Sequence, residues 1–239
     1  SFAAQPEYMA VNRGLLERIY PSLRPGFIHL DVATGTGLVP QLLGEHAGRL
    51  GIRGRIIGVD PDTFALRQAR AATKNLPGIY TSFEEGTGQT LSRIVDDYKI
   101  AGIIPIEGVD SVSIHDAIHE IPGSDAKRAT INQMARALRP DGTFTMNSGF
   151  TTLGQGDNPL PWGKWKLAAL RMAGAHRIKG AKGIDTLKPE EYETMVTDAG
   201  LEIVEATTQA IHLTGDSLVA ISKYPGFIDG FFGDTDMAR

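Results

Sequence analysis

The sequence has 239 residues, of which 22% are charged, with 24 Lys and Arg against 28 Asp and Glu. The formal net charge of −4 gives no indication of a nucleic-acid binder with a basic face, and the length allows one large domain with a sizeable core. The chain contains no cysteine, which excludes disulfides and thiolate metal sites. We therefore expect a cytoplasmic protein, without a signal peptide or a membrane span.

The first half of the chain is organised around a small-residue turn. An amphipathic helix is expected over 7–19, followed by a strand over 28–32, the turn Ala33-Thr34-Gly35-Thr36-Gly37 and a helix that begins at Leu38. A strand, a tight glycine turn and a helix start form a recess where the backbone approaches a ligand closely. Asp31 stands near the strand end, so its carboxylate would disfavour a pyrophosphate there and welcome a cation or an ammonium group.

A second acid ends the next expected strand. This strand, over 55–60, finishes at Asp60, roughly 20 residues past the glycines, where an acid can hold a ribose by its hydroxyls. Pro61 suits the first turn of the helix expected over 63–74. A third strand over 79–83 then leads into Phe83-Glu84-Glu85.

Histidines follow the fourth expected strand. The chain passes from a helix over 90–98 to a strand over 109–114, and directly into His115-Asp116-Ala117-Ile118-His119-Glu120. A histidine in such a loop could orient a substrate or take its proton. Adjacent residues do not face one site, so His119 and Glu120 are not expected to share a metal, and no metal site is predicted. A helix over 125–138, the turn Arg139-Pro140-Asp141-Gly142 and a strand over 143–147 come next.

These motifs resemble one known family. The spacing D-x-A-x-G-x-G from Asp31, the acid that ends the second strand, and the R-P-D-G turn before a strand resemble the class I S-adenosylmethionine-dependent methyltransferases. Ala33 stands where many members have the first glycine. The resemblance implies a doubly wound α/β fold with a mostly parallel seven-stranded sheet whose last strand is antiparallel. Its last two strands would be 201–206 and 213–223, after a helix that begins near Lys188 and ends at Ala199.

The resemblance also implies a division of the chain and a set of site residues. A single domain over 1–239 would carry an N-terminal helical cap over 1–26 and a helical substrate lid inserted over 149–186. The residues expected to bind the cofactor, with the adenine beside Phe83 and Glu84, are Asp31, Ala33, Gly35, Gly37, Asp60, Pro61, Phe83, Glu84 and His115. The candidate catalytic residues are His115 and His119, and the candidate substrate-binding residues are Tyr8, Asn12, Trp162 and Trp165.

The expected reaction is methyl transfer from S-adenosylmethionine, with S-adenosylhomocysteine as the product. The acceptor would be an N, O or C atom of a small, partly apolar or aromatic metabolite, as in specialised or quinone-like metabolism. The tail over 225–239, with several Phe residues, is expected to fold back over the domain or into a second copy of the chain, which is a further candidate partner, because exposed apolar residues in a free tail would be a liability. Two alternatives stay open: a nicotinamide oxidoreductase, which Pro40 disfavours where G-x-G-x-x-G needs a glycine, and a non-catalytic domain of the same fold.

Overall fold

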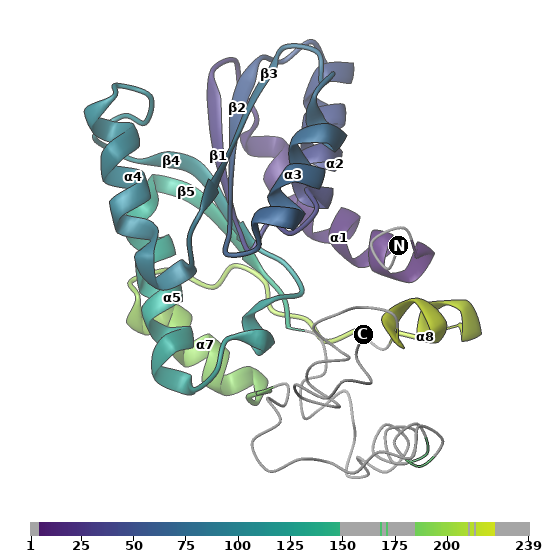
Figure 1. The fold of residues 1–239 in the computed structure, drawn as a ribbon. Coiled ribbons are helices and arrows are strands. Elements are labelled where there is room, and N and C mark those ends of the chain that lie inside the picture. The colour runs from purple at the N-terminus through teal and green to yellow at the C-terminus, as the bar shows by residue number, and fades with distance from the viewer. Residues whose placement is uncertain are drawn as a thin grey trace.

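A parallel five-stranded sheet forms the centre of the molecule (Figure 1). This computed structural model describes residues 5–148, 168, 171, 185–209, 211–212 and 214–222. In spatial order the strands are β3 (Ile79–Glu85), β2 (Gly54–Asp60), β1 (Phe27–Val32), β4 (Val109–Ile114) and β5 (Leu138–Met146). The order reverses between β1 and β4, and ligands of open α/β sheets bind at the carboxyl ends of the strands at such a switch point.

Helices cover both faces of the sheet, as a doubly wound fold requires (Figure 1). One face carries α1 (Pro6–Ile19), α2 (Leu38–Arg49) and α3 (Thr63–Thr73). The other carries α4 (Leu91–Ile100), α5 (Ser124–Ala137) and α7 (Pro189–Asp198). Short 3-10 turns are η2 (Tyr20–Ser22), η3 (Gly88–Thr90) and η4 (Ile118–Glu120). The expected α/β architecture is therefore confirmed.

The two faces of the central strands differ in chemistry. Because side chains alternate along a strand, Ile28, Leu30 and Val32 join the apolar core beneath α4, α5 and α7. On the opposite face of β1, Phe27 packs beneath α1 and α2, but the next side chains on that face are His29 and Asp31, both buried. On this face the side chains of β1 therefore become polar toward the switch point, and the opposite face supplies the main core.

The R-P-D-G turn interrupts the pairing of β4 with β5. Val109 pairs with Leu138, but Ser111 already pairs with Thr143, so the residues of the turn are accommodated as a bulge within β5. Asp141 has a φ of 60°, the left-handed value of the third position of a type II turn with Pro140 second. The expected turn is present, although it lies inside the strand and not before it.

The C-terminal part of the chain differs from the expectation of seven strands. Residues 201–209 form no strand, and α8 (Gly215–Ser222) is a helix where a strand was expected over 213–223. The Oγ1 of Thr214 accepts a hydrogen bond from the Ser217 N–H at 3.2 Å, which caps the start of α8. Capping of the helix start thus outweighs the β-branched residues, which favoured a strand. The described residues form five strands, all parallel.

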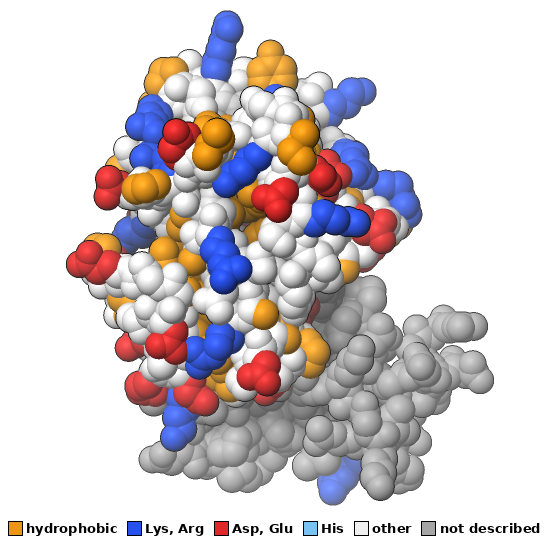
Figure 2. All heavy atoms as spheres, turned by 90° about the vertical axis from the view of Figure 1, so that its left-hand side faces the viewer, with side chains coloured by type: hydrophobic (Ala, Val, Ile, Leu, Met, Phe, Trp, Pro, Cys, Tyr) orange, Lys and Arg blue, Asp and Glu red, His pale blue; other side chains and the backbone are white. Residues whose placement is uncertain are grey.

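Several expectations fall outside the part of the chain that is described. These are most of the lid over 149–186, including Trp162 and Trp165, and the tail over 225–239; within the lid, Ala168 and Arg171 are helical. None of the described helices has the length and apolar character needed to cross a bilayer. Figure 2 shows acidic and basic side chains interspersed on the side of the molecule that carries α4.

Candidate functional site: the glycine turn at the switch point

The turn between β1 and α2 needs an unusual backbone. Ala33, Gly35 and Gly37 have φ angles of 56°, 53° and 87°, in the left-handed region. A Cβ added at Gly37 would lie 2.9 Å from the Cα of Ala69 in α3, so only glycine fits there. A Cβ added at Gly35 would meet nothing within 4 Å, so the turn exposes backbone to open space. This is the recess that the sequence predicts.

Ala33 occupies a position that favours glycine. A residue with a Cβ at positive φ costs roughly 1 kcal/mol or more, because the Cβ crowds the following carbonyl. The structure therefore shows a physical reason why the resembling family often has glycine at this place, and it shows that the backbone of this chain adopts the same conformation with alanine.

Asp31 lies at the base of the recess with 2% of its surface exposed. Its Oδ2 accepts a hydrogen bond from the Thr34 hydroxyl at 2.7 Å, and its Oδ1 accepts one from the Ser113 hydroxyl at 2.5 Å. Burial raises the pKa of Asp31 to about 7, although the two hydroxyls act to lower it. An ammonium group brought to this carboxylate would replace the lost hydration and favour its charged form.

Asp60 joins the tip of β2 to the turn. Its Oδ2 accepts the Gly35 N–H at 2.8 Å and its Oδ1 accepts the Asp62 N–H at 2.8 Å. Burial raises the pKa of Asp60, while these two bonds act to lower it. Because a carboxylate can accept about four hydrogen bonds, Asp60 retains capacity for the hydroxyls of a sugar. Pro61 is exposed and follows it just before α3.

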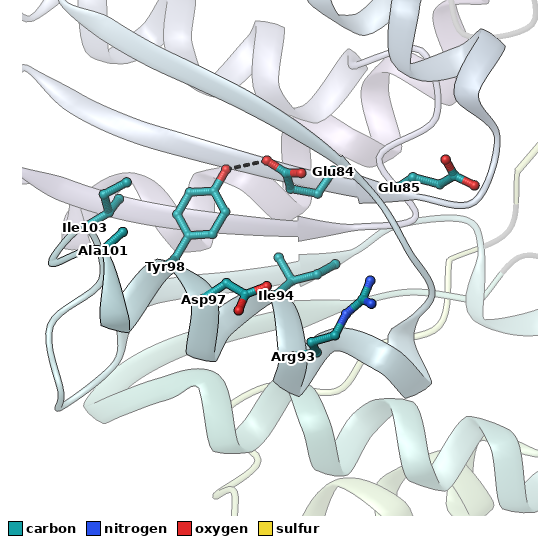
Figure 3. A pocket seen from close by; sticks show the side chains of 8 residues that line it. All are labelled: Glu84, Glu85, Arg93, Ile94, Asp97, Tyr98, Ala101 and Ile103. Atoms are coloured by element: carbon teal, nitrogen blue, oxygen red, sulfur yellow. Dashed lines mark hydrogen bonds between the residues drawn. The ribbon is translucent and has the colours of Figure 1, made fainter.

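Phe83 and Glu84 lie one strand further from β1. The Phe83 ring is buried against Leu66 and Ala69 of α3, so it contributes to the core there. The Oε1 of Glu84 accepts the Tyr98 hydroxyl at 2.7 Å, beside a pocket of about 320 Å³ between β3 and α4 (Figure 3). Successive residues of a strand point to opposite faces, so these two side chains do not form one wall. Their role beside an adenine stays a prediction.

The His115 side chain is buried, and both of its ring nitrogens have hydrogen-bond partners. Its Nδ1 lies 3.1 Å from the Oδ1 of Asn12 in α1, and its Nε2 lies 3.0 Å from the Oγ1 of Thr145 in β5. The amide nitrogen of Asn12 donates to the Tyr8 carbonyl and the Asp116 carboxylate, so its Oδ1 must be the acceptor and His115 must carry its proton on Nδ1. Burial lowers the pKa of His115 to about 3, so the ring is neutral.

Asp116 was not singled out by the sequence, yet it has the most constrained backbone of this loop. Its φ is 52°, and its carboxylate accepts hydrogen bonds from Asn12 Nδ2 at 3.0 Å, Asn147 Nδ2 at 2.6 Å and the side chain of Tyr8. Its own N–H donates to Asn147 Oδ1 at 2.7 Å. Non-glycine residues at positive φ cluster at functional sites. Nothing local in the sequence signals this, because the contacts join Asp116 to Asn147, 31 positions away, and to Asn12, 104 positions away.

His119 is buried rather than exposed, and burial with the nearby Lys127 lowers its pKa to about 4. Its backbone carbonyl accepts the Asp185 N–H at 3.0 Å. The Asp185 carboxylate in turn accepts the Gly123 N–H at 2.8 Å and pairs with the buried Lys127 Nζ at 3.0 Å. The loop after β4 therefore holds Asn147 and Asp185, the residues on either side of most of the expected lid. No group of three or more metal-ligand side chains occurs among the described residues.

Replacing His115 with alanine is expected to lower the free energy of unfolding by about 2–3 kcal/mol, because it leaves Asn12 and Thr145 with buried unpaired groups. Urea titration measures this change, and hydrogen exchange should show faster exchange in α1. His212→Ala, at an exposed histidine, is the matched control and should change stability by less than about 0.5 kcal/mol. Equal stability of the two variants would contradict the enclosed role of His115.

A family model described as a methyltransferase domain matches residues 23–197, which includes the whole sheet. The chain belongs to the class I S-adenosylmethionine-dependent methyltransferase family. The match covers the switch point, the glycine turn and both acidic strand tips of the methyltransferase. It confirms the family that the Asp31, Gly35, Gly37 and Asp60 spacing indicates.

The methyltransferase is also similar to individual known proteins. The release factor glutamine methyltransferase of Mycobacterium tuberculosis is 28% identical over an alignment of 161 residues, and the match covers 63% of this chain and 52% of the relative. The chain thus spans about half the length of the curated relatives it matches. A putative methyltransferase from Bacillus halodurans has a TM-score of 0.52 at 17% identity, covering 81% of this chain and 71% of that one. An O-methyltransferase family protein from Burkholderia thailandensis has a TM-score of 0.50 at 16% identity, covering 87% and 58%. These two structures support the fold alone.

Proposed function

We propose that the chain binds S-adenosylmethionine in the recess and transfers its methyl group to an N, O or C atom of a small, partly apolar or aromatic metabolite. The observation that carries this proposal is the convergence of Asp31 and Asp60 on a glycine turn that is open at Gly35. Asp31 would receive the ammonium group of the cofactor, and Asp60 would accept the ribose hydroxyls. Family membership supports methyl transfer, and the geometry of the turn and the two acids supports the recess as the cofactor site.

The cofactor supplies an activated methyl group, so this chain's own residues mainly align the reactants and exclude water. The loop after β4 stands beside the recess, and α1 is joined to it through Tyr8 and Asn12. We assign His115 an orienting role, since both of its ring nitrogens have partners and its ring stays neutral. It could accept a proton only if the Thr145 hydroxyl turned away. A catalytic role for His119 stays a prediction.

The acceptor is proposed on separate grounds. Trp162 and Trp165 of the lid, both outside the described residues, favour a partly apolar or aromatic molecule. The relative from Mycobacterium tuberculosis is named for a glutamine of a release factor, but its low identity and partial coverage do not carry that acceptor to this chain. A homodimer and a cytoplasmic location remain proposals of the same kind.

Isothermal titration calorimetry with S-adenosylhomocysteine tests the proposal, with NADPH as the comparison ligand. We expect binding of the first and none of the second, because the third position of a dinucleotide fingerprint is Pro40, buried at the start of α2. Binding of NADPH alone would support the oxidoreductase alternative. Turnover of labelled S-adenosylmethionine with a panel of small acceptors then separates an enzyme from a non-catalytic binding domain.

The affinity for S-adenosylhomocysteine is expected to fall as the pH drops below 7. In the free protein the pKa of Asp31 is about 7, and an ammonium ligand lowers it, so binding releases a proton below this pH. The dissociation constant should therefore be flat near pH 8 and rise by up to about tenfold per pH unit well below 7. Titrations between pH 5.5 and 8, in buffers of different ionisation enthalpy, measure the affinity and the proton release.

Asp31→Asn is the control for this pH dependence, because the amide cannot ionise. Glu120 also titrates in this range: its side chain is exposed, but partial desolvation and the nearby Asp60 and Asp116 raise its pKa to about 7. The Asn variant should bind more weakly at pH 8 and show a smaller slope than the wild type. A slope equal to that of the wild type would assign the pH dependence to Glu120 or another group.

A further inference from the structure

A buried histidine lies two residues before Asp31 on the same face of β1. His29 has no exposed surface, and its Nδ1 lies 2.8 Å from the Ser111 hydroxyl and its Nε2 lies 3.0 Å from the Ser113 hydroxyl, both in β4. Ser113 is also the residue whose hydroxyl donates to Asp31 at 2.5 Å. A continuous row of hydrogen bonds thus runs from Ser111 through His29 and Ser113 to the carboxylate at the base of the recess.

The direction of this row follows from the number of protons available. The single proton of the Ser113 hydroxyl is donated to Asp31, so its oxygen can only accept from His29. The Nε2 of His29 therefore carries the ring proton, and Nδ1 accepts from the Ser111 hydroxyl. Each donor in the row points toward Asp31, which is the arrangement that favours a charged carboxylate at its end.

The surroundings of the row keep His29 in one tautomer. Burial, and to a smaller extent the nearby His115, lower the pKa of His29 to about 3, so the ring carries one proton. The charged or titratable groups that act on the row are Asp60 from β2, which acts on Asp31, and His115 from the loop after β4. From α1, the residue next to His115 is the uncharged Asn12. No charge from the described residues therefore competes with Asp31 for the Ser113 proton.

We propose that His29 is a positioning residue for cofactor binding, which fixes the Ser113 hydroxyl as a donor to Asp31 and so keeps that carboxylate ionised and oriented toward the ammonium group of the ligand. This inference rests on the proposed function, because it assigns Asp31 to the ammonium group. Without the His29 proton, the oxygen of the Ser113 hydroxyl loses its donor, and nothing holds the hydroxyl in the orientation that donates to Asp31. Asp31 then loses a donor to its charged form and holds a proton to higher pH.

Two polar variants of His29 separate this role from simple packing. His29→Gln places an amide donor near the position of Nε2 and can still reach Ser113, whereas His29→Asn is one methylene shorter and can reach only Ser111. Calorimetry with S-adenosylhomocysteine should show about three- to tenfold weaker binding at pH 7.5 for the Asn variant and nearly unchanged binding for the Gln variant. The midpoint of the pH profile should rise by about 0.5–1 unit in the Asn variant only.

Ile56→Ala is the matched control for lost stability. Ile56 pairs with His29 across β1 and β2 and is fully buried in the cluster beneath α1 and α2, but it takes no part in the row. Its truncation should lower the unfolding free energy and leave the pH profile of binding unchanged. A pH midpoint that shifts equally in the Gln and Asn variants, or in neither, would overturn the role of His29. Failure of the wild type to bind S-adenosylhomocysteine would instead overturn the proposed function.

Discussion

Asp60→Ala is expected to weaken the binding of S-adenosylhomocysteine by about 2–3 kcal/mol, or roughly 30- to 150-fold in dissociation constant. The variant loses the proposed acceptor of the ribose hydroxyls, and it also loses the acceptor of the Gly35 and Asp62 N–H groups that hold the glycine turn in place. Calorimetry at pH 8, where Asp31 is ionised, measures the effect without interference from proton release.

The neighbouring acid supplies the control for this experiment. Asp62 caps α3 by accepting the Phe64 and Ala65 N–H groups at 2.7 and 3.2 Å, and its side chain does not reach the turn. Asp62→Ala should lower stability by about 1 kcal/mol and leave ligand affinity nearly unchanged. An Asp60→Ala protein that binds as tightly as the wild type would remove Asp60 from the ribose site.

Asp110→Ala is expected to lower the free energy of unfolding by about 2–4 kcal/mol. Asp110 is 7% exposed at the start of β4, and its Oδ1 accepts from Arg24 at 2.7 Å and Arg139 at 2.9 Å. Its Oδ2 accepts the Ile28 N–H at 2.9 Å. One carboxylate thus joins the chain before β1, the start of β4 and the turn within β5. Urea denaturation measures the loss of stability.

The arginine partners provide the comparison. The side chain of Arg24 is 59% exposed, and without it Asp110 keeps its bonds to Arg139 and the Ile28 N–H, so Arg24→Ala should cost less than about 1 kcal/mol. Asp110 lies at the amino end of its strand, opposite the recess, so neither variant should change the affinity for S-adenosylhomocysteine. A stability loss for Asp110→Ala no larger than that for Arg24→Ala would show that the buried carboxylate adds little.

The recess was largely predictable from sequence, because its parts are local. The strand, the small-residue turn and the helix from Ile28 to Leu43 lie in one continuous segment, and the positive φ angles of its turn favour glycine, as at Gly35 and Gly37. Asp60 was predictable since parallel strands end at the same edge of the sheet. His115 was expected beside the recess for the same reason, because it directly follows β4. Its hydrogen bonds with Asn12 and Thr145 could not be predicted from the sequence.

The parts that sequence reasoning missed depend on distant contacts. Asp116, Asn147 and His29 acquire their roles only when α1, β1, β4 and β5 are brought together, and no local pattern reports such pairing. Phe83 illustrates the same limit, because an aromatic residue at a strand tip is equally compatible with a ligand wall and with a core. The structure shows its ring packed against α3, and its role beside an adenine stays a prediction. Asn12 of α1 likewise contacts His115 and Asp116 in the loop after β4, and only the tertiary structure shows these contacts.

The sequence by itself determined the family, the parallel α/β core and the position of the recess in which we propose that the cofactor binds, because glycine conformation, strand periodicity and acids at strand ends act over short stretches of chain. Only the tertiary structure decided that His115 is an enclosed neutral ring and that a directed row of hydrogen bonds leads from Ser111 to Asp31. Both features depend on which polar groups are buried next to one another, and packing across the sheet determines this.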